Sequence, residues 1–376
     1  MAKRGHGEGS IYQRKKDGRW VGEITLEDGR RKPFYGKTRK EAYDKMQNAL
    51  LEQKQGKLAT GPHQKLGDYL ERWFEQVHKP TLSDSTVYRY QGILNNHILP
   101  ELGHIQLQKL TAQQVQAFYT KKTNEGHSAS DIVKMHQLLH KALANAVRWR
   151  LVSHNVCDDV TVPKRVKYEA HPLTIEEARQ LLQAARGHRL ETFVILALTT
   201  GMRRGELLGL KWSDIDLDHG ILQVERTVAR IGRLGVIESK PKSAKSRRRI
   251  ILTRFTIEAL TRHRTHLVEA RLKAGERWEN TEWVFCNIYG RRLESAIVQR
   301  LFVALLKKAG LAHMRVHDLR HSAATFLLSL GVHPKVVQEI LGHSQFSITM
   351  DTYSHVLPLM HQEAMDKLND LFRGFI

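Results

Sequence analysis

The sequence has little cysteine, no long apolar run and a shortage of acidic residues. Its two cysteines, Cys157 and Cys286, stand far apart without metal-ligand spacing, so neither a disulfide framework nor a zinc site is indicated. No apolar run approaches the roughly 18 residues that a transmembrane helix needs, and the start of the chain has no signal-peptide core. We therefore expect no membrane partner, and a reducing cytoplasm as the compartment.

Basic residues are in large excess. Sixty Lys and Arg side chains against 39 Asp and Glu give a formal net charge of +21 for 376 residues. Such a charge favours a polyanionic partner, of which double-stranded DNA is one. The length allows two or three domains, each with its own hydrophobic core.

The first 62 residues predict a small sheet followed by a helix. Turn signals that end at Gly18 and Gly29 separate three expected strands, at 10–14, 19–26 and 31–35. Thr38 and Glu41 have the spacing of a capping box, and apolar residues at helical intervals follow them.

The basic residues of this segment concentrate on the expected strands and turns: Arg14, Lys15, Lys16, Arg19, Arg30, Arg31 and Lys32. A sheet of this kind can place one face in a major groove and bind phosphates with its edges. The alternative is a solvated basic edge that only prevents aggregation.

The middle segment, 63–160, is expected to be all-helical. Apolar positions at helical spacing predict helices at 66–73, 86–99, 111–119 and 132–146, the second ending before Pro100. No catalytic constellation stands in this segment. Its apolar stripes therefore predict a packed core.

The third segment, 171–376, is expected to be mainly helical with some strand, an α+β arrangement. Thr174 and Glu177 predict a helix start, and the apolar run 193–198 predicts a buried helix that ends near Thr200. A strand is expected at 221–229, and a loop after it.

Side chains suited to phosphoryl transfer gather near the end of the chain. His317 and Arg320 stand three apart in a helical stretch, so both can face one phosphate. Tyr353 adds a phenol that, once deprotonated, can attack phosphorus and hold it as a phosphotyrosine ester. The carboxylate groupings of a two-metal nuclease do not occur, so we expect a metal-independent reaction without a cofactor.

Three segments carry a resemblance to a known family. TGMRRGELLGLKW, HDLRHSAATFLLSLG and LGHSQFSITMDTYSHV resemble the three signature boxes of the tyrosine recombinases, in the same order. The N-terminal pattern is similar to the arm-binding domain of phage-type integrases. The resemblance implies an arm-type DNA-binding domain at 1–62, a helical, SAM-like core-binding domain at 63–160 and a catalytic domain at 171–376.

The resemblance also implies a catalytic set: Arg203, Lys242, His317, Arg320, His343 and Tyr353. In this set the two arginines clamp the phosphate and the tyrosine is the nucleophile. Outside the set, the resemblance implies that Glu206 is a buttress rather than an acid. Lys242 stands in a basic stretch similar to the lysine hairpin of relatives. Lys240 and Lys245 stay open as alternatives for its role.

The function implied is that of a site-specific DNA integrase of a phage or mobile element. It would cut and rejoin attachment-site DNA through a 3′-phosphotyrosine, without ATP, as a homo-tetramer in a bacterial cytoplasm or nucleoid. An excisionase or a host DNA-bending protein is the expected accessory partner for excision.

Two other functions stay open from the sequence. One is a non-catalytic, sequence-specific DNA-binding regulator, and the other is a resolvase-like or topoisomerase-like relative. Apolar residues at helical intervals after Tyr353 predict a terminal helix that docks either on a neighbouring protomer or on its own domain.

Overall fold

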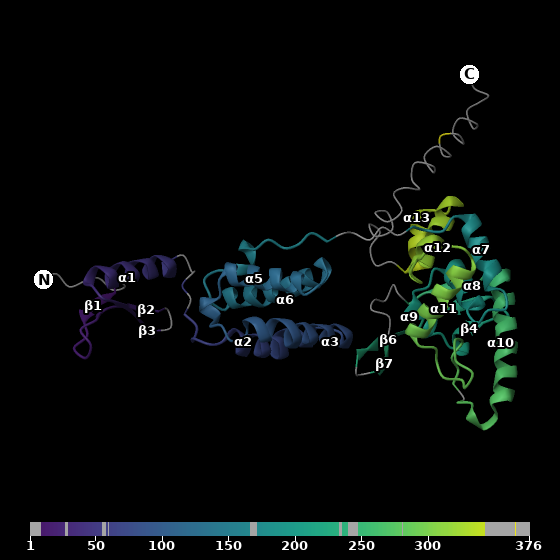
Figure 1. Cartoon of the computed structure of the whole chain (residues 1–376), viewed down its shortest axis with the longest axis horizontal. Coiled ribbons are helices and arrows are strands. Elements are labelled where there is room, and N and C mark those ends of the chain that lie inside the picture. Colours follow the sequence, from purple (N-terminus) through teal and green to yellow (C-terminus); the bar gives the residue numbers. More distant parts are fainter. Residues whose placement is uncertain are drawn as a thin grey trace, which may run out of the picture. The chain divides into compact units, whose positions relative to one another are not determined.

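The computed structural model describes residues 9–26, 29–54, 58, 60–165, 171–232, 235–239, 247–279, 281–342 and 365. The chain forms two compact units, Met1–Lys167 and Tyr168–Ile376 (Figure 1). Within the described ranges, no helix is long and apolar enough to cross a membrane.

The first unit begins with an antiparallel sheet and one helix, as predicted. The strands β1 (Ser10–Gln13), β2 (Trp20–Thr25) and β3 (Arg31–Gly36) pair in the order β1-β2-β3, and α1 (Arg39–Lys54) follows. At the start of α1 the Glu41 N–H donates to Thr38 Oγ1 at 3.1 Å, and the Glu41 carboxylate accepts from the Lys37 N–H at 2.8 Å. These bonds satisfy donors that a helix start leaves unpaired.

One face of this sheet packs closely on α1. A Cβ at Gly22 would lie 2.9 Å from the Ala42 carbonyl oxygen, so only glycine allows this approach. On the opposite face Val21 pairs with Tyr12 on one side and Tyr35 on the other. The two tyrosines are 44% and 43% exposed and Val21 is 1% exposed, so the tyrosines form an outward row over Val21.

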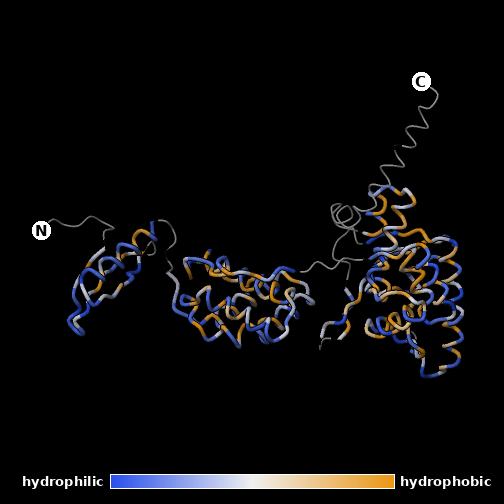
Figure 2. The backbone as a smooth tube through the Cα atoms, turned by 45° about the horizontal axis from the view of Figure 1, so that its top comes forward, coloured by the Kyte–Doolittle hydropathy of each residue, from blue (hydrophilic) through white to orange (hydrophobic). Residues whose placement is uncertain are grey.

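The rest of the first unit is all-helical, as predicted. Its helices are α2 (Leu66–Trp73), α3 (Asp84–Ile93), α4 (Leu99–Leu102), α5 (Ala112–Asn124) and α6 (Ala129–Arg148). They enclose one core that includes Trp73, Phe118 and Leu139. Figure 2 shows hydrophobic residues recurring along these helices, as amphipathic helices around a core require.

One predicted boundary in this unit is wrong. The second helix does not stop before Pro100, because a π-helical turn, Leu94–Ile98, carries the chain from α3 into α4. Pro100 lies in the first turn of α4. A proline is tolerated there because the first N–H groups of a helix have no intrahelical partner.

The second unit is mainly helical. Its helices are α7 (Ile175–Ala185), α8 (Glu191–Thr200), α9 (Arg204–Leu208), α10 (Arg254–Ala274), α11 (Ser295–Lys308), α12 (Asp318–Ser329) and α13 (Pro334–Leu341). The predicted buried helix is α8, in which every residue except Glu191 and Thr199 is buried. It packs against α7, α10 and α12 and is the centre of the core.

The strand predicted at 221–229 is divided into two strands that belong to different sheets. β4 (Ile215–Asp216), β5 (Ile221–Gln223) and β8 (Arg249–Ile251) form one sheet, while β6 (Thr227–Ile231) and β7 (Gly235–Ser239) form a separate hairpin. Between β5 and β6 the Arg226 side chain forms an ion pair with Asp214 and also donates to the Gly209 carbonyl. These contacts fix the chain where it leaves the first sheet.

A second π-helical turn lies at Phe74–His78, and the described residues also include single turns of 3-10 helix. They lie at Lys79–Thr81, Leu107–Lys109, Val156–Asp159, Trp212–Asp214 and Gly275–Arg277.

Candidate active site

Arg203 lies at a sharp turn between α8 and α9. Gly201 ends α8 in the left-handed region, with φ 60°, which favours glycine. Two residues later Arg203 has extended backbone angles and becomes the residue that precedes α9. The turn therefore brings Arg203 out of the buried helix, and its side chain is 37% exposed.

The Glu206 carboxylate binds both the backbone and the side chain of Arg203. Its Oε2 accepts from the Arg203 backbone N–H at 2.9 Å, and its Oε1 accepts from Arg203 Nη1 at 2.8 Å. The carboxylate is 3% exposed. Burial alone raises the pKa of Glu206, but the charges and hydrogen bonds of Arg248 and Arg203 outweigh burial and lower it. Glu206 thus stays ionised, in the buttress role that the resemblance implies.

Arg320, in the first turn of α12, connects two distant helix ends. It is 3% exposed, and its Nη1 donates to the Gly201 carbonyl at 2.7 Å. Its Nη2 donates to the Leu341 carbonyl, also at 2.7 Å. The guanidinium is therefore fixed between the end of α8 and the end of α13.

Three arginines meet at the end of α13. Arg248 Nε donates to the Ile340 carbonyl at 2.6 Å, and Arg320 Nη2 binds the next carbonyl, that of Leu341. Arg203 Nη2 donates to the carbonyl of Gly342 at 3.3 Å. The last carbonyls of a helix lack intrahelical partners and carry partial negative charge, so three cations are well placed there. We call Arg203, Arg248 and Arg320 on these carbonyls the arginine cluster.

Arg248 is the member of this cluster that the sequence analysis missed. Its side chain is 6% exposed, and Nη2 donates to Glu206 Oε2 at 2.9 Å. A signal was present in the sequence, because Arg248 and Ile250 alternate with Arg247 and Arg249 where the chain enters β8. Alternate residues of a strand share a face, so Arg248 lies on the face of buried Ile250 while its two neighbours are exposed.

His317 immediately precedes α12, three residues before Arg320. Partial burial of its ring, then His321 and Arg320, lowers the pKa of His317 to about 4, although the residue as a whole is exposed. The His321 ring lies 5.3 Å away, at 88° to it. A neutral imidazole beside an arginine can accept a proton at neutral pH.

The other predicted catalytic residues lie outside the described residues. These are Lys242, its alternatives Lys240 and Lys245, His343 and Tyr353. Of the predicted set, the structure therefore places Arg203, His317 and Arg320. It brings both arginines to the end of α13, immediately before His343 in the chain.

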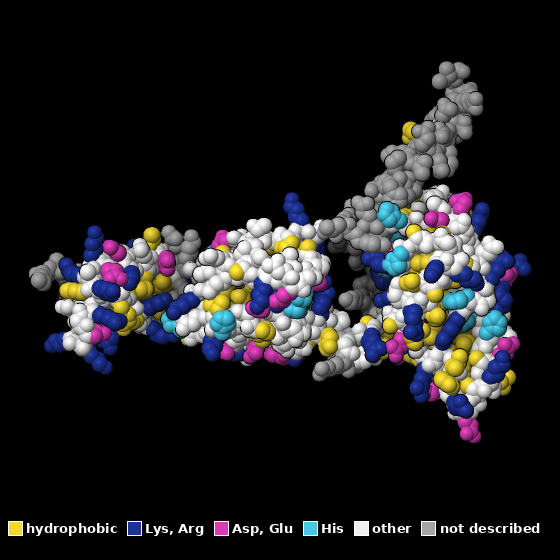
Figure 3. All heavy atoms as spheres, viewed as in Figure 1, with side chains coloured by type: hydrophobic (Ala, Val, Ile, Leu, Met, Phe, Trp, Pro, Cys, Tyr) yellow, Lys and Arg dark blue, Asp and Glu magenta, His cyan; other side chains and the backbone are white. Residues whose placement is uncertain are grey.

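The predicted DNA-binding residues of the sheet divide between its two faces. Side chains along a strand point alternately to the two faces of the sheet, and Arg14 and Arg31 are on the face of Tyr12 and Tyr35, opposite α1. Arg14 lies 6.0 Å from the centre of the Tyr35 ring. Lys32 lies toward α1, over Phe34. Burial lowers the pKa of Lys32, partly offset by Glu52 of α1. Lys and Arg side chains are scattered over the visible surface of this part, among hydrophobic and other residues (Figure 3).

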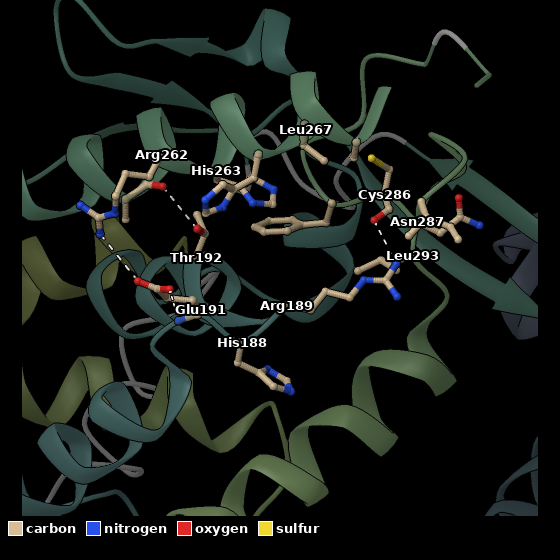
Figure 4. Close-up of a pocket in the computed structure, with 16 residues that line it drawn as sticks. His188, Arg189, Glu191, Thr192, Arg262, His263, Leu267, Cys286, Asn287 and Leu293 are labelled. Atoms are coloured by element: carbon tan, nitrogen blue, oxygen red, sulfur yellow. Dashed lines mark hydrogen bonds and ion pairs between the residues drawn. The ribbon is translucent and has the colours of Figure 1, made fainter. Parts of the chain in front are cut away.

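A cavity of about 240 Å³ opens at the other end of α8 (Figure 4). Its wall includes Thr192 of α8, His263 of α10 and the segment around Cys286, and Arg189 Nη2 donates to the Cys286 carbonyl at 3.2 Å. Burial raises the pKa of the Cys286 thiol to about 11. The cavity wall contains none of the predicted catalytic residues. Among the residues that the structure describes, no group of His, Cys, Asp or Glu is arranged to hold a metal ion.

Two solved structures show which known proteins share this fold. The Tn1549 transposon integrase in complex with circular intermediate DNA has a TM-score of 0.68 and 19% identity, over 81% of this chain and 99% of that one. A lambda integrase dimer bound to a COC′ core site has a TM-score of 0.58 and 21% identity, over 94% and 96%. The fold is that of the integrases.

Sequence comparison gives the family. Residues 172–359 match the phage integrase family, and residues 65–123 match its N-terminal SAM-like domain. The tyrosine recombinase XerC-like protein of Caldanaerobacter subterraneus subsp. tengcongensis is 31% identical, over 95% of this chain and 98% of that protein. The chain belongs to the phage integrase family. It is a tyrosine recombinase, an enzyme that cuts and rejoins DNA at specific sites.

Proposed function

We propose that this recombinase integrates the DNA of a phage or mobile element at attachment sites, and excises it when an accessory protein bends or bridges the DNA. The observation that carries the proposal is the arginine cluster. Two of its members, Arg203 and Arg320, stand in the family's signature positions and are fixed by the ends of α8 and α13. A regulator that only binds DNA has no need for such an arrangement.

The arginines would stabilise the transition state of strand cleavage. Attack on a phosphodiester builds negative charge on the non-bridging oxygens, and positioned cations that meet this charge lower the barrier. Arg203 supplies the more exposed guanidinium, at 37%, and Arg320 supplies a buried one. Because hydrogen bonds to the protein already orient both side chains, little reorganisation is needed when DNA arrives.

The remaining roles follow the chemistry of the transfer. The Tyr353 oxygen forms a bond to phosphorus while the bond from phosphorus to the 5′ oxygen breaks. His317 accepts the tyrosine proton, Lys242 gives a proton to the leaving 5′ oxygen, and His343 hydrogen-bonds the phosphate. The 3′-phosphotyrosine keeps the energy of the broken bond, so a second 5′ hydroxyl reverses the step without ATP or a metal ion.

The three predicted domains would divide the DNA between them. Residues 1–62 would bind arm-type sites through the tyrosine face of the sheet, with Arg14 and Arg31 on phosphates. Residues 63–160 and 171–376 would hold the core site from two sides. We further propose that four copies assemble on the recombining DNA, in the cytoplasm of a bacterial host.

The first experiment is cleavage of a suicide substrate. Nicked DNA that carries a candidate core site is incubated in EDTA with the wild type, with Tyr353→Phe and with Tyr289→Phe as a matched control. We expect a covalent adduct from the wild type and from the control, and none from Tyr353→Phe. If all three proteins bind a verified core tightly and none forms an adduct, the regulator replaces the recombinase as the best proposal.

A further inference from the structure

Arg248 connects three parts of the second unit that are distant in sequence. It lies immediately before β8, and its backbone carbonyl accepts from the Val224 N–H at 2.9 Å, which extends the pairing with β5. Its side chain leaves this sheet for Glu206 and for the Ile340 carbonyl, 42 and 92 residues away in the chain. Arg248 thus connects the sheet with the first signature box and with the end of α13.

The contacts of Arg248 require the shape of a guanidinium. Nε and Nη2 lie on one edge of the planar group, and they donate to two acceptors that belong to different elements, at 2.6 Å and 2.9 Å. A lysine ammonium is a single point charge without this fork. Lysine at this position would keep the charge, but we expect it to lose one of the two directed bonds.

The arrangement of Glu206 explains how Arg248 can influence Arg203. Glu206 Oε2 accepts from Arg248 Nη2 and from the Arg203 backbone, while Oε1 accepts from Arg203 Nη1. Burial opposes the ionised carboxylate, and Arg248 is the strongest influence that favours it. Without Arg248, the carboxylate that orients Arg203 loses a directed bond and one of its two compensating charges.

The end of α13 gives a second connection. Arg248 binds the first of three consecutive carbonyls, and Arg320 and Arg203 bind the next two. Any shift of the Ile340 carbonyl therefore moves the acceptors of the two proposed phosphate clamps. His343 and the segment that leads to Tyr353 begin directly after these carbonyls.

We infer that Arg248 is a positioning residue for strand cleavage, which orients Arg203 through Glu206 and fixes the end of α13 on which Arg203 and Arg320 rest. The inference rests on the proposed function. Arg248 acts through the other two arginines and is not assigned a contact with DNA. Its loss is therefore expected to slow cleavage of bound DNA while leaving DNA affinity almost unchanged.

The first test compares Arg248→Gln and Arg248→Lys with Arg249→Gln, whose side chain lies on the exposed face of the same strand. Each full-length protein is titrated with core-site DNA, and single-turnover cleavage of the suicide substrate is measured at saturating DNA. We expect Arg248→Gln to cleave about 100-fold more slowly, as misplaced catalytic groups do, with nearly wild-type affinity. Arg248→Lys is expected to lie between it and the wild type, and Arg249→Gln to match the wild type.

The second test asks through which residue Arg248 acts. If Glu206 transmits the effect, Arg248→Gln in a Glu206→Gln background slows cleavage only about threefold or less further, because coupled residues are not additive. A substrate with sulfur at the bridging 5′ position has a leaving group that needs no proton. We expect this substrate to restore cleavage by Lys242→Ala but not cleavage by Arg248→Gln.

The outcomes separate this inference from the proposed function. An adduct from the wild type, with Arg248→Gln as fast as Arg249→Gln, overturns the inference and leaves the recombinase intact. If the sulfur substrate restores cleavage by Arg248→Gln, the inference is also overturned, because Arg248 then acts through the lysine stretch. Absence of any wild-type adduct on a verified core counts against the proposed function itself. Should Arg248→Gln fail to fold, the same comparisons are made with Arg248→Lys.

Discussion

Gly201 and Leu341 are in such close contact that a Cβ at position 201 would lie 2.3 Å from Leu341 Cδ2. This contact joins the end of α8 to the end of α13, the two helix ends that Arg320 also connects. Gly201 has φ 60°, so a side chain there is disfavoured by its backbone conformation as well. The glycine of the first signature box is therefore needed for packing and for the turn.

We expect Gly201→Ala to lower the free energy of unfolding by about 2 to 5 kcal/mol, the sum of left-handed strain and overpacking. The rate of DNA cleavage is expected to fall as well, because Arg320 binds the carbonyls of Gly201 and Leu341 and Arg203 binds that of Gly342. Chemical denaturation and the suicide substrate measure the two effects. Gly187→Ala is the matched control, since Gly187 has φ 68° but no atom within 4 Å of an added Cβ. Equal losses in the two variants would contradict the packing argument.

Glu206→Gln is expected to lower the free energy of unfolding by about 3 kcal/mol and to slow cleavage. The substitution leaves Arg248, whose side chain is 6% exposed, without its buried counter-charge, and breaking one partner of a buried pair is costly. Differential scanning calorimetry and single-turnover cleavage measure both effects. Glu258→Gln, in an exposed pair with Arg254, serves as control and is expected to change the stability by less than about 1 kcal/mol. A change in Glu206→Gln no larger than in this control would argue against the buttress.

His317 predicts a pH dependence of stability. The pKa of His317 is about 4 in the folded chain, against 6.5 for an unperturbed histidine. Partial burial and the charges of His321, Arg320 and Arg315 lower it, and together they outweigh the opposing charge of Asp318. Between these values the unfolded chain binds a proton that the folded chain does not, so stability falls as the pH falls from about 6.5 to about 4. In thermal unfolding across this range, His317→Gln is expected to lose less stability than the wild type. His313→Gln, which replaces an exposed histidine of the same unit, should follow the wild type.

The two faces of the N-terminal sheet predict different roles for neighbouring residues. Arg31→Gln is expected to weaken binding of arm-type DNA and to reduce the slope of log affinity against log salt by about 1, as loss of one phosphate contact does. Lys32→Gln is expected to change both less, because Lys32 lies toward α1 over Phe34. Titrations of DNA at several salt concentrations measure the slope. Equal effects of the two substitutions would show that the tyrosine face is not the DNA-binding face.

The basic stretch that contains Lys240, Lys242 and Lys245 predicts one general acid. We expect Lys242→Ala to slow cleavage of normal DNA by about 100- to 10,000-fold, the usual contribution of a general acid, and Lys240→Ala and Lys245→Ala to slow it far less. The substrate with bridging 5′ sulfur is expected to abolish the difference. If one of the other two variants shows the large defect and the rescue, the role passes to that lysine.

Much of the local structure was predictable from short-range chemistry. The capping boxes at Thr38 and Thr174, the turn signals at Gly18 and Gly29, and the apolar run of α8 act within a few residues of themselves. These signals gave the order of elements correctly. They failed where distant contacts decided the outcome, as at Arg226, whose bond to Asp214 lies where the expected strand divides.

The sequence by itself determined the family and the N-terminal sheet with its helix, and it predicted Arg203, His317 and Arg320 as catalytic residues, because motif spacing and caps are local properties. Only the tertiary structure decided that Arg203, Arg248 and Arg320 share consecutive carbonyls at the end of α13. Arg203 and Gly342 are 139 residues apart, and Arg248 and Ile340 are 92 apart. No local pattern specifies such meetings. They arise because the packing of α8, α12 and α13 brings unpaired carbonyls and buried cations to one place.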